Sequence, residues 1–526
     1  MKCTFALGFL FAFLVLPPVV QADDASSPET IKLTLRSRVE TEKDSGRFRL
    51  VYKTVEWDPA KTAVIISDMW DDHYCKRAAA RVDEMAPRMN DVLAEARRRG
   101  ALVIHAPSGT MDHYKDTPQR KRALEAPEVA TKAPLKRWCH HDPQHEAPMP
   151  VDTSQPCDDP KPGKAVRVYH HQNDALDIEP PDAIADGFEA FYLMEQRGIE
   201  NVIIMGVHTN MCVLGRPFGI RQLVYQGKNV VLMRDMTDAM YRPSCPPGVS
   251  HVRGTELVIE HIEKYWCPTC TSTDLLGRPA FRFQEDTRPH VAVIVSDDHY
   301  HADKTLPEFA QMLREDYGCY CTVLHGQGKA DIPGTEELEK ADVLVLYVRR
   351  LGLPKKQLGR IRAYLDAGKP LVALRTASHA FAVKYKEPKG YQPAEGTDEW
   401  RAFDPEVLGG NYHNHGPNAA GSDIAIVPEQ KDHPILRGVE PARWHSVGSL
   451  YYLGPIKDDA TLLMTASSGD RTEPLTWIRK YHGGRIFFTG LGHPEDFKEP
   501  PFRRLLINAI FWAMDQPVPE PRQNKE

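Results

Sequence analysis

A cysteine stands where a predicted strand is followed by a predicted helix. The stretch "GVHTNMCVLG" runs from Gly206 to Gly215 and comes directly after the apolar run "NVIIM". Cys212 is therefore expected at or near a helix start, where unpaired backbone N–H groups and the helix dipole favour a thiolate. A thiolate can attack a carbonyl carbon. The pattern alone leaves two interpretations open: a nucleophile, or a small residue that packs well at this junction.

An acid follows a second predicted strand. Asp68 comes directly after the apolar run "TAVIIS". In open α/β sheets, ligands bind beyond the carboxyl ends of the strands, so residues at these ends can be neighbours. A carboxylate near Cys212 can take the thiol proton, while a nearby cation balances the charge. The alternative is that Asp68 only caps a turn.

Apolar strands alternate with amphipathic helices across residues 57–265. The predicted elements are, in order, "TAVIISDMW", "MAPRMNDVLAEARRRG", "ALVIHAP", "VRVYHH", "AIADGFEAFYLMEQRG", "NVIIMGV" and "NVVLMRDM". Such alternation indicates a parallel sheet that is covered on both faces. Between Ser108 and Ala165 lies an insertion rich in proline, histidine and charge, and insertions of this length are usually functional or disordered.

The α/β pattern stops and starts again further along the chain. A second domain is expected over residues 289–517, with strands in "VAVIVS", "ADVLVLYV" and "PLVALR", and residues 266–288 are interpreted as a linker. Residues 28–56 alternate polar and apolar side chains around "KDSG", which predicts a β-hairpin. The fold class is therefore α/β, with two domains that are each a parallel-sheet, three-layer αβα sandwich.

The first residues resemble a secretory signal. Lys2 precedes an apolar run from Phe5 to Leu16, and small residues stand at Val20 and Ala22. We expect residues 1–22 to be a signal peptide that is cleaved after about Ala22, and the protein to be secreted or periplasmic. The alternative is an N-terminal membrane anchor. No other run approaches the roughly 20 apolar residues of a membrane helix, so no membrane contact is expected after cleavage.

Charge and cysteine content narrow the possibilities further. The formal net charge is −6 and the basic residues are scattered, so we expect no nucleic-acid partner. Nine cysteines follow Cys3, an odd number that is compatible with four disulfides and one free thiol. "CPTC", from Cys267 to Cys270, is interpreted as a local disulfide or two free thiols, because no second CxxC motif completes a zinc site.

The stretches "AVIISDMW" and "GVHTNMCV" together resemble the isochorismatase-like cysteine hydrolases, which include the nicotinamidases. The resemblance covers roughly residues 57–265, and "VVLMRDMTDA" matches the strand that follows the cysteine motif in that family. It implies that Asp68 and Cys212 belong to a catalytic triad with a lysine. It also implies a non-proline cis peptide near Val207 and His208.

One member of that triad is missing here. In the register of "HHQNDAL", His170 stands where the family has its lysine, and Lys164 comes too early. A histidine can donate to a carboxylate and carries charge when paired with one. The expected triad is therefore Asp68, His170 and Cys212. Trp70 replaces the usual polar residue after the aspartate and is expected to form an aromatic wall for the substrate.

The resemblance also implies an oxyanion hole and raises the question of a metal. Backbone N–H groups of His208, Thr209 and Asn210 are expected to hold the oxyanion. Nicotinamidases have a metal site of one aspartate and two histidines. Candidates by composition alone lie in the insertion: Asp112, His113, His140 and His141. Histidines in a charged loop are usually just solvated, and neither a metal nor another cofactor is expected.

Four motifs of the second domain resemble the ThuA-like, or trehalose-utilisation, family. They are "LVALRTASHAF", "VLGGNYHNHGP", "HPILRGV" and "EPLTWIRKYHGGRIFFTGLGH". The resemblance implies an α/β fold like that of class I glutamine amidotransferases. His415 and His493 match family histidines, whereas Arg375 and His379 replace a histidine and an aspartate. These four residues form either a polar pocket for a sugar-like ligand or a set of core side chains.

Together the observations indicate an exported enzyme with a small-molecule substrate. We expect hydrolysis of a small amide or related C–N bond through a thioester at Cys212, with a carbohydrate-related role for the second domain. The alternative is a carbohydrate-binding or carbohydrate-modifying protein whose first domain is a non-catalytic scaffold.

Overall fold

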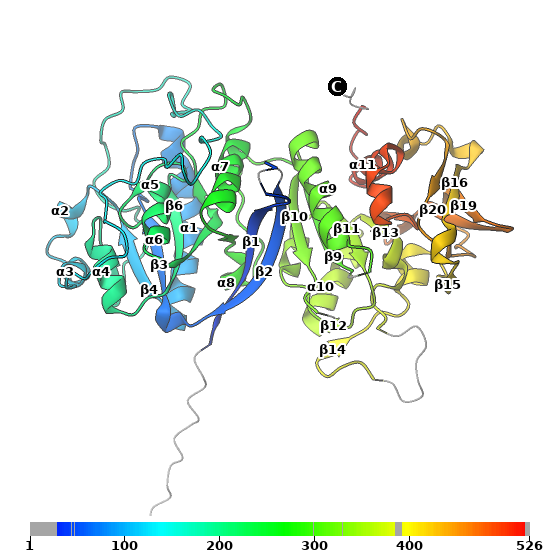
Figure 1. The fold of residues 1–526 in the computed structure, drawn as a ribbon, viewed down its shortest axis with the longest axis horizontal. Helices are drawn as coiled ribbons and strands as arrows, with labels where there is room; N and C mark the ends of the chain where they lie inside the picture. The colour runs from blue at the N-terminus through cyan, green and yellow to red at the C-terminus, as the bar shows by residue number, and fades with distance from the viewer. Residues whose placement is uncertain are drawn as a thin grey trace, which may run out of the picture.

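Two α/β units follow one another along the chain in a computed structural model of this protein (Figure 1). The structure describes residues 29–520, except residues 44, 47, 298, 329 and 384–391. The expected signal peptide, residues 1–22, lies outside the described residues. Within the described ranges, no helix combines the length and the apolar character that a membrane crossing needs.

The first unit is built on an eight-stranded sheet with the order β2-β1-β8-β7-β6-β3-β4-β5. The strands from β8 to β5 are parallel, β1 pairs antiparallel with β8, and β2 pairs antiparallel with β1. The strands are β1 (Ile31–Glu40), β2 (Phe48–Trp57), β3 (Thr62–Ser67), β4 (Leu102–Ala106), β5 (Ala183–Ile184), β6 (Asn201–Val207), β7 (Asn229–Asp238) and β8 (Thr269–Cys270). The helices are α1 (Lys76–Arg99), α2 (Met111–Tyr114), α3 (Pro118–Leu124), α4 (Glu189–Gln196), α5 (Cys212–Gly215), α6 (Ile220–Tyr225), α7 (His251–Tyr265) and α8 (Thr273–Leu276).

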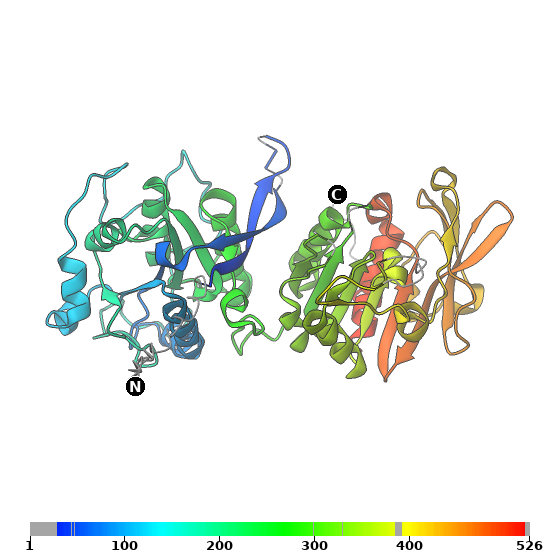
Figure 2. The same cartoon turned by 90° about the horizontal axis from the view of Figure 1, so that it is seen from below.

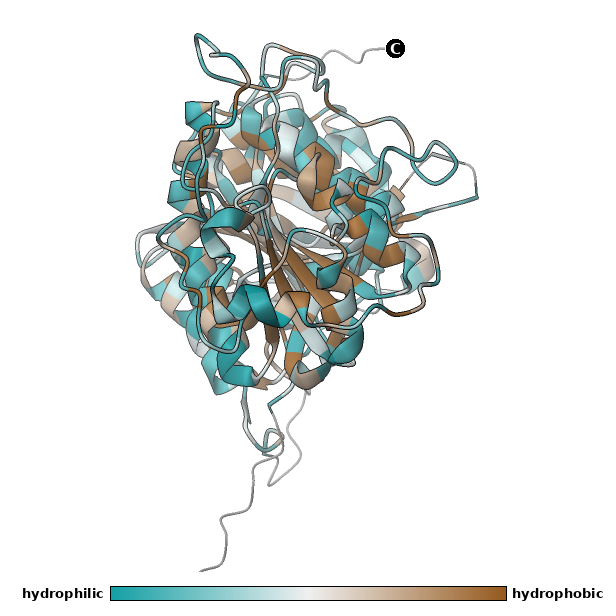
Figure 3. Cartoon of the chain, turned by 90° about the vertical axis from the view of Figure 1, so that its left-hand side faces the viewer, coloured by the Kyte–Doolittle hydropathy of each residue, from teal (hydrophilic) through white to brown (hydrophobic). Residues whose placement is uncertain are grey.

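The central strand β3 shows why this unit has three layers. Val64 and Ile66 pack with residues of α1, whereas Ala63 and Ile65 pack with residues of α4 and α7. Successive strand residues point to opposite faces, so an all-apolar strand needs cover on both sides. Viewed from this end of the molecule, hydrophobic strands lie between helices whose outer surfaces are more polar (Figure 3).

The prediction of one strand in this unit is wrong. Residues 166–171, "VRVYHH", form no strand, and the short strand β5 begins instead at Ala183, inside the segment that was predicted to be helical. Residues near 170 run as extended chain that is bound to side chains: the backbone N–H groups of His170 and His171 donate to Asp71 Oδ1. An extended run with alternating side chains resembles a strand in sequence even where no neighbouring strand pairs with it.

The second unit contains a nine-stranded sheet with the order β10-β9-β11-β13-β21-β20-β19-β16-β17. Its parallel part is β10 (Tyr320–His325), β9 (His290–Ser296), β11 (Val343–Val348), β13 (Leu371–Leu374) and β21 (Gly484–Thr489). An antiparallel extension follows: β20 (Arg471–Tyr481), β19 (Thr461–Ser468), β16 (Ser422–Ile426) and β17 (Arg443–Ser446). Short pairs are β12 (Leu353–Pro354) with β14 (Thr397–Asp398), and β15 (Asn414–His415) with β18 (Tyr451–Tyr452).

Helices cover both faces of the parallel part. The helices are α9 (Ala302–Tyr317), α10 (Lys355–Asp366) and α11 (Pro500–Ala513). In β9, Val291 and Val293 pack with α9 and α11, and Ala292 and Ile294 pack with α10. The predicted fold class, two α/β units with helices on both faces of a largely parallel sheet, is confirmed.

The hairpin β1–β2 lies between the two units in both cartoon views (Figures 1 and 2). It extends the first sheet through β8 and also packs against the second unit, where Tyr52 contacts His325 with ring centroids 4.3 Å apart. The expected linker, residues 266–288, contains β8 and α8, and so part of it belongs to the first sheet. The two units are therefore joined by contacts as well as by the chain.

Candidate active site

The candidate nucleophile follows β6, which pairs with β3 through Gly206 and Ser67 at its end. Gly206 in β6 has a φ of +110°, and a Cβ atom there would lie 2.1 Å from the carbonyl oxygen of Ser67. Only glycine fits such a close approach of two backbones. The peptide bond between Val207 and His208 is cis, as the resemblance implied. Cys212 then begins α5 and is 7% exposed.

Asp68 is buried at the end of the neighbouring strand β3. Its Oδ1 accepts a hydrogen bond from the backbone N–H of Ser108 at 2.8 Å, and its Oδ2 accepts one from Arg216 Nε at 3.1 Å. The Asp68 carboxylate and the Arg216 guanidinium both act on the pKa of the Cys212 thiol, in opposite directions. The structure thus brings together the expected acid and the expected thiol, and adds a cation that the sequence analysis did not identify.

Arg216, not His170, occupies the cationic position beside Asp68. The His170 side chain is 79% exposed, and its Nδ1 lies 3.4 Å from Asp71 Oδ2. Assigning His170 to the triad was wrong because it assumed a strand at residues 166–171. Arg216 stands four residues after Cys212, and its backbone N–H donates to the Cys212 carbonyl at 3.0 Å. The spacing of about one helical turn between Cys212 and Arg216 could have identified this arginine from the sequence.

The residue that faces the site from this segment is Tyr169. Its ring stacks on Trp70 with centroids 4.2 Å apart and planes 12° apart. Burial, followed by the nearby Asp68 carboxylate, raises the pKa of the Tyr169 hydroxyl. Trp70 is itself buried and donates Nε1–H to the carbonyl of Ser108 at 3.1 Å. Trp70, which was expected to line a substrate, therefore stacks on Tyr169.

A second tryptophan approaches from the long insertion. The Arg216 guanidinium lies over the ring of Trp138, 5.7 Å from its centroid. The next residue, Cys139, donates its backbone N–H to the carbonyl of Gly215 at 2.7 Å. A Cβ atom on Gly215 would come within 2.7 Å of the Trp138 ring. The insertion thus covers α5 and takes part in forming the site.

The electrostatics favour a protonated thiol in the free protein. Burial and the Asp68 carboxylate raise the pKa of Cys212, while Arg216 acts in the opposite direction. Burial also raises the pKa of Asp68, and the charge of Arg216 is the strongest influence that lowers it. Arg216 favours the anionic form of both groups, so a proton can pass from Cys212 to Asp68 without leaving an isolated charge.

One of the backbone N–H groups expected in the oxyanion hole already donates to another residue. The backbone N–H of Thr209 donates to the carbonyl of Asp238 at 2.8 Å, so Thr209 does not fit that role. For the N–H groups of Asn210 and Cys212 we find no acceptor in the part of the chain that the structure describes. The imidazole of His208 is buried, and burial lowers its pKa to about 3.

The histidines of the insertion do not gather around one point. His141 Nε2 lies 3.0 Å from the carbonyl of Ala147, whereas the ring of His113 lies 5.2 Å from that of His171. Among the described residues, the one group of three or more side chains placed to share a metal ion is Cys75, Cys157 and Asp159. It includes none of the candidates Asp112, His113, His140 and His141.

A second polar cluster lies at the strand ends of the second unit. Arg375 follows β13 with a φ of +43° and is 2% exposed. Its guanidinium lies 4.4 Å from the ring centroids of both Tyr300 and Tyr451. Nη1 donates to the carbonyl of Gly490 at 2.9 Å, and Nη2 donates to Ser449 Oγ at 3.3 Å. Arg375 is thus held between two tyrosines.

The expected histidines surround this pair of tyrosines. The ring of His493 lies 6.0 Å from Tyr300, and the rings of His379 and His415 each lie 6.1 Å from Tyr451. The two tyrosine hydroxyls are 3.3 Å apart. The four residues singled out from the sequence therefore gather around two tyrosines that the sequence analysis did not identify.

One comparison with known protein families covers most of the second unit. Residues 291–513 match the family model ThuA, described as trehalose utilisation. A solved ThuA-like protein of Bacteroides uniformis is 16% identical, with a TM-score of 0.33, and covers 45% of this chain and 95% of its own. No curated protein matches the sequence.

Two solved hydrolase-type structures are also similar to the chain. A cysteine hydrolase of Pseudomonas syringae pv. phaseolicola is 19% identical, with a TM-score of 0.26, and covers 42% of this chain and 93% of its own. An isochorismatase family protein of Burkholderia thailandensis is 14% identical, with a TM-score of 0.23, and covers 41% and 94%.

Proposed function

We propose that this chain, in which residues 291–513 form a ThuA domain, hydrolyses a small amide or related C–N bond at Cys212. The observation that carries the proposal is the meeting of a buried thiol, a buried carboxylate and a guanidinium at the ends of β3 and β6. Each group has the role that acyl transfer requires: a nucleophile, a base and a cation that balances charge. The motif resemblance to cysteine hydrolases supports the same reaction class.

The first step is proton transfer and attack. Asp68 accepts the thiol proton of Cys212, and the thiolate that forms is stabilised by Arg216. The thiolate attacks the carbonyl carbon of the substrate, and the N–H groups of Asn210 and Cys212 donate to the oxyanion. One such donor typically contributes about 2.7–4 kcal/mol to transition-state stabilisation.

The second step releases the amine and regenerates the thiol. Asp68, now protonated, donates its proton to the leaving nitrogen, and a thioester remains at Cys212. Asp68 then accepts a proton from water as the water attacks the thioester, and it returns this proton to the Cys212 thiolate when the acid leaves. The Trp70–Tyr169 stack beside Asp68 supplies a flat apolar wall. This wall supports a substrate with a planar group next to the carbonyl.

A panel of small aromatic and aliphatic amides tests the proposal, with ammonia or amine release as the measurement. Intact-mass spectrometry after rapid acid quench should detect an acyl adduct on Cys212 for any amide that is turned over. Cys212→Ala should reduce turnover to background and remove the adduct. Turnover by Cys212→Ala at the rate of the unchanged protein would exclude this mechanism.

The arginine–tyrosine cluster supports a sugar-like ligand in the ThuA domain. It offers aromatic rings together with hydroxyl and guanidinium groups, the combination that a polyol ligand needs. A thermal-shift screen of saccharides and keto-sugars tests this proposal. A ligand at 100 times its dissociation constant should stabilise the protein by about 2.7 kcal/mol. Tyr300→Phe should weaken that effect.

The same two assays distinguish the alternative function from the proposed hydrolysis. A carbohydrate-binding or carbohydrate-modifying protein with a non-catalytic first domain would show the saccharide response but no acyl adduct on Cys212. Export remains part of the proposal, and mass spectrometry of the protein from its native host should find a chain that begins near Asp23.

A further inference from the structure

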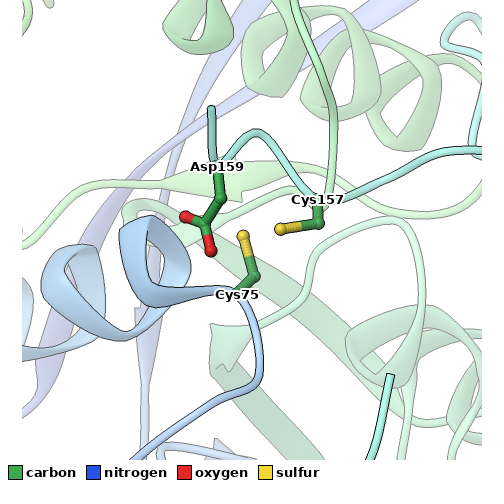
Figure 4. Close-up of side chains that lie close together, drawn as sticks. All are labelled: Cys75, Cys157 and Asp159. Carbon is green, nitrogen blue, oxygen red and sulfur yellow. The ribbon is translucent and has the colours of Figure 1, made fainter. Parts of the chain in front are cut away.

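Two cysteines that are distant in sequence meet beside the start of α1. Cys75 immediately precedes this helix and is fully buried, and Cys157, from the long insertion, is 4% exposed. Their sulfur atoms point toward one another beside the carboxylate of Asp159 (Figure 4). The two sulfurs and a carboxylate oxygen all lie within 4.8 Å of one another.

The backbone around Cys157 is already fixed against the helix. The Asp159 carboxylate accepts hydrogen bonds from the N–H groups of Lys76 and Arg77, both at 2.9 Å, and thereby caps α1. Asp158 accepts two bonds from Arg81, at 2.9 and 3.1 Å. Asp158 and Asp159, the two residues that follow Cys157, are thus held by hydrogen bonds. The two sulfurs therefore approach one another in the folded protein without further ordering of the chain.

We propose that Cys75 and Cys157 form a disulfide that ties the insertion to α1. The reaction is thiol–disulfide exchange with a small-molecule or protein disulfide as the oxidant. One cysteine attacks the oxidant as a thiolate and forms a mixed disulfide, and one thiol of the oxidant leaves. The second cysteine then displaces the other thiol. Two protons and two electrons leave the cysteine pair, and the oxidant is reduced to two thiols.

The partners of the nearby carboxylates favour a disulfide over a bound metal ion. Both oxygens of Asp159 already accept backbone hydrogen bonds, and those of Asp158 accept from Arg81. A divalent ion would have to replace the helix cap and lie close to the Arg81 cation. A disulfide removes weak thiol bonds, such as that from Cys75 Sγ to Asp158 Oδ1 at 3.4 Å, and Asp158 keeps its two bonds to Arg81.

The bond would act on the part of the insertion that forms the candidate active site. Cys157 lies between Trp138, which contacts Arg216, and Tyr169, which stacks on Trp70. Between these contacts the insertion contains little regular structure after α3 ends at Leu124. A cross-link between distant residues restricts the unfolded chain, and it restricts it more when the enclosed loop is long.

Peptide mapping under non-reducing conditions tests the proposal directly. The full-length protein is equilibrated with a mixture of oxidised and reduced glutathione, alkylated, digested and analysed by mass spectrometry. A cross-linked peptide containing Cys75 and Cys157 is expected. Cys139, whose Sγ donates to Gln222 Oε1 at 3.3 Å, serves as the internal control and should remain a free thiol. Alkylation of both Cys75 and Cys157 in the folded, equilibrated protein would overturn the proposal.

Stability measurements give a second, independent test. Reduction should lower the melting temperature of the unchanged protein by about 5 °C or more. The double variant Cys75→Ser, Cys157→Ser should show no such response, whereas Cys139→Ser should respond like the unchanged protein. Elemental analysis for zinc tests the competing outcome, a metal site. One zinc ion per chain, with no disulfide between the two cysteines, would show that they bind a metal ion instead. Should the double variant fail to fold, the peptide map of the unchanged protein still decides.

Discussion

Arg216 donates its Nε–H to Asp68 Oδ2 at 3.1 Å, from a position one helical turn beyond Cys212. One short segment thus supplies both the candidate nucleophile and the cation of the site. The acid comes from a separate strand that is distant in the sequence. A cation anchored next to the nucleophile keeps its charge at any physiological pH, because an arginine does not lose its proton in proteins.

Replacing this cation should be costly. In Arg216→Ala, the buried Asp68 carboxylate loses its ion pair and keeps the bond from the N–H of Ser108 and the interaction with the Cys212 thiol. Removing one partner of a buried ion pair typically costs about 3–5 kcal/mol, and we expect about 3 kcal/mol because Arg216 is partly exposed. Denaturant unfolding measures the loss. Arg216→Lys, which retains the charge, should lose clearly less, and equal losses in both variants would contradict this account.

Alkylation of Cys212 should be slow near neutral pH and should accelerate as the pH rises above 9. Burial and Asp68 raise the pKa of its thiol, so the reactive thiolate is scarce in the free protein. Asp68→Asn removes one of these causes and leaves Arg216 in place. The alkylation rate at pH 8 should then rise by about tenfold for each unit by which the pKa falls.

Mass spectrometry of the Cys212 peptide after timed iodoacetamide treatment measures this rate. Cys139, which is buried in the long insertion, is the control, and its rate should not change between the two proteins. Equal rates at Cys212 before and after Asp68→Asn would show that the carboxylate does not act on the thiol.

Truncating Tyr169 should lower the stability of the protein, whereas truncating its neighbour His170 should have almost no effect. Tyr169→Ala removes the stack on Trp70 and should cost about 1–2 kcal/mol, since aromatic pairs contribute beyond the area that they bury. His170→Ala changes an exposed side chain and should stay within about 0.5 kcal/mol. Thermal and denaturant unfolding of both variants measure the difference. A large effect of His170→Ala would contradict the exposed position of this side chain.

Asp404 should make the ThuA domain less stable as the pH rises. Burial raises the pKa of this carboxyl to about 7, against about 3.9 in an unfolded chain. Between these values the unfolded state has released the proton and the folded state still holds it. The free energy of unfolding therefore falls as the pH rises from about 4 to about 7, by up to about 1.4 kcal/mol per unit.

Denaturant unfolding at several pH values tests the effect of Asp404, with Asp404→Asn as the matched variant. The asparagine keeps an oxygen that can accept the N–H of Tyr412, which now donates to Asp404 Oδ2 at 2.7 Å. Its pH profile should be flatter than that of the unchanged protein over this window. Parallel profiles would assign the pH dependence to other groups.

Cleavage within residues 266–288 should not separate the two units. This segment contributes β8 to the first sheet, and Arg288 at its end binds Glu256 at 2.7 Å. The hairpin β1–β2 adds contacts to the second unit, including Tyr52 with His325. Limited proteolysis followed by native gel filtration should therefore yield nicked protein that elutes with the intact species. Two separate folded fragments would mean that the hairpin contacts are weak.

The sequence by itself determined the α/β class, the restart of the pattern at a second unit, and the positions of Asp68 and Cys212. These features depend on local properties. Apolar runs bounded by glycine and polar residues mark buried strands, and a residue that follows such a strand lies at the sheet edge wherever the strand is placed. His493 followed from its place after a predicted strand and from the motif resemblance, whereas His415 followed from the resemblance alone.

Only the tertiary structure decided which groups complete each site. Arg216 replaced His170 because residues 166–171 do not pair with a neighbouring strand, so the orientation of their side chains follows contacts with Asp71 and Trp70 and not a sheet register. Tyr300 and Tyr451 reach Arg375 from segments that are distant in sequence. Contacts of this kind depend on how strands and loops are placed in space, and local periodicity carries no information on that placement.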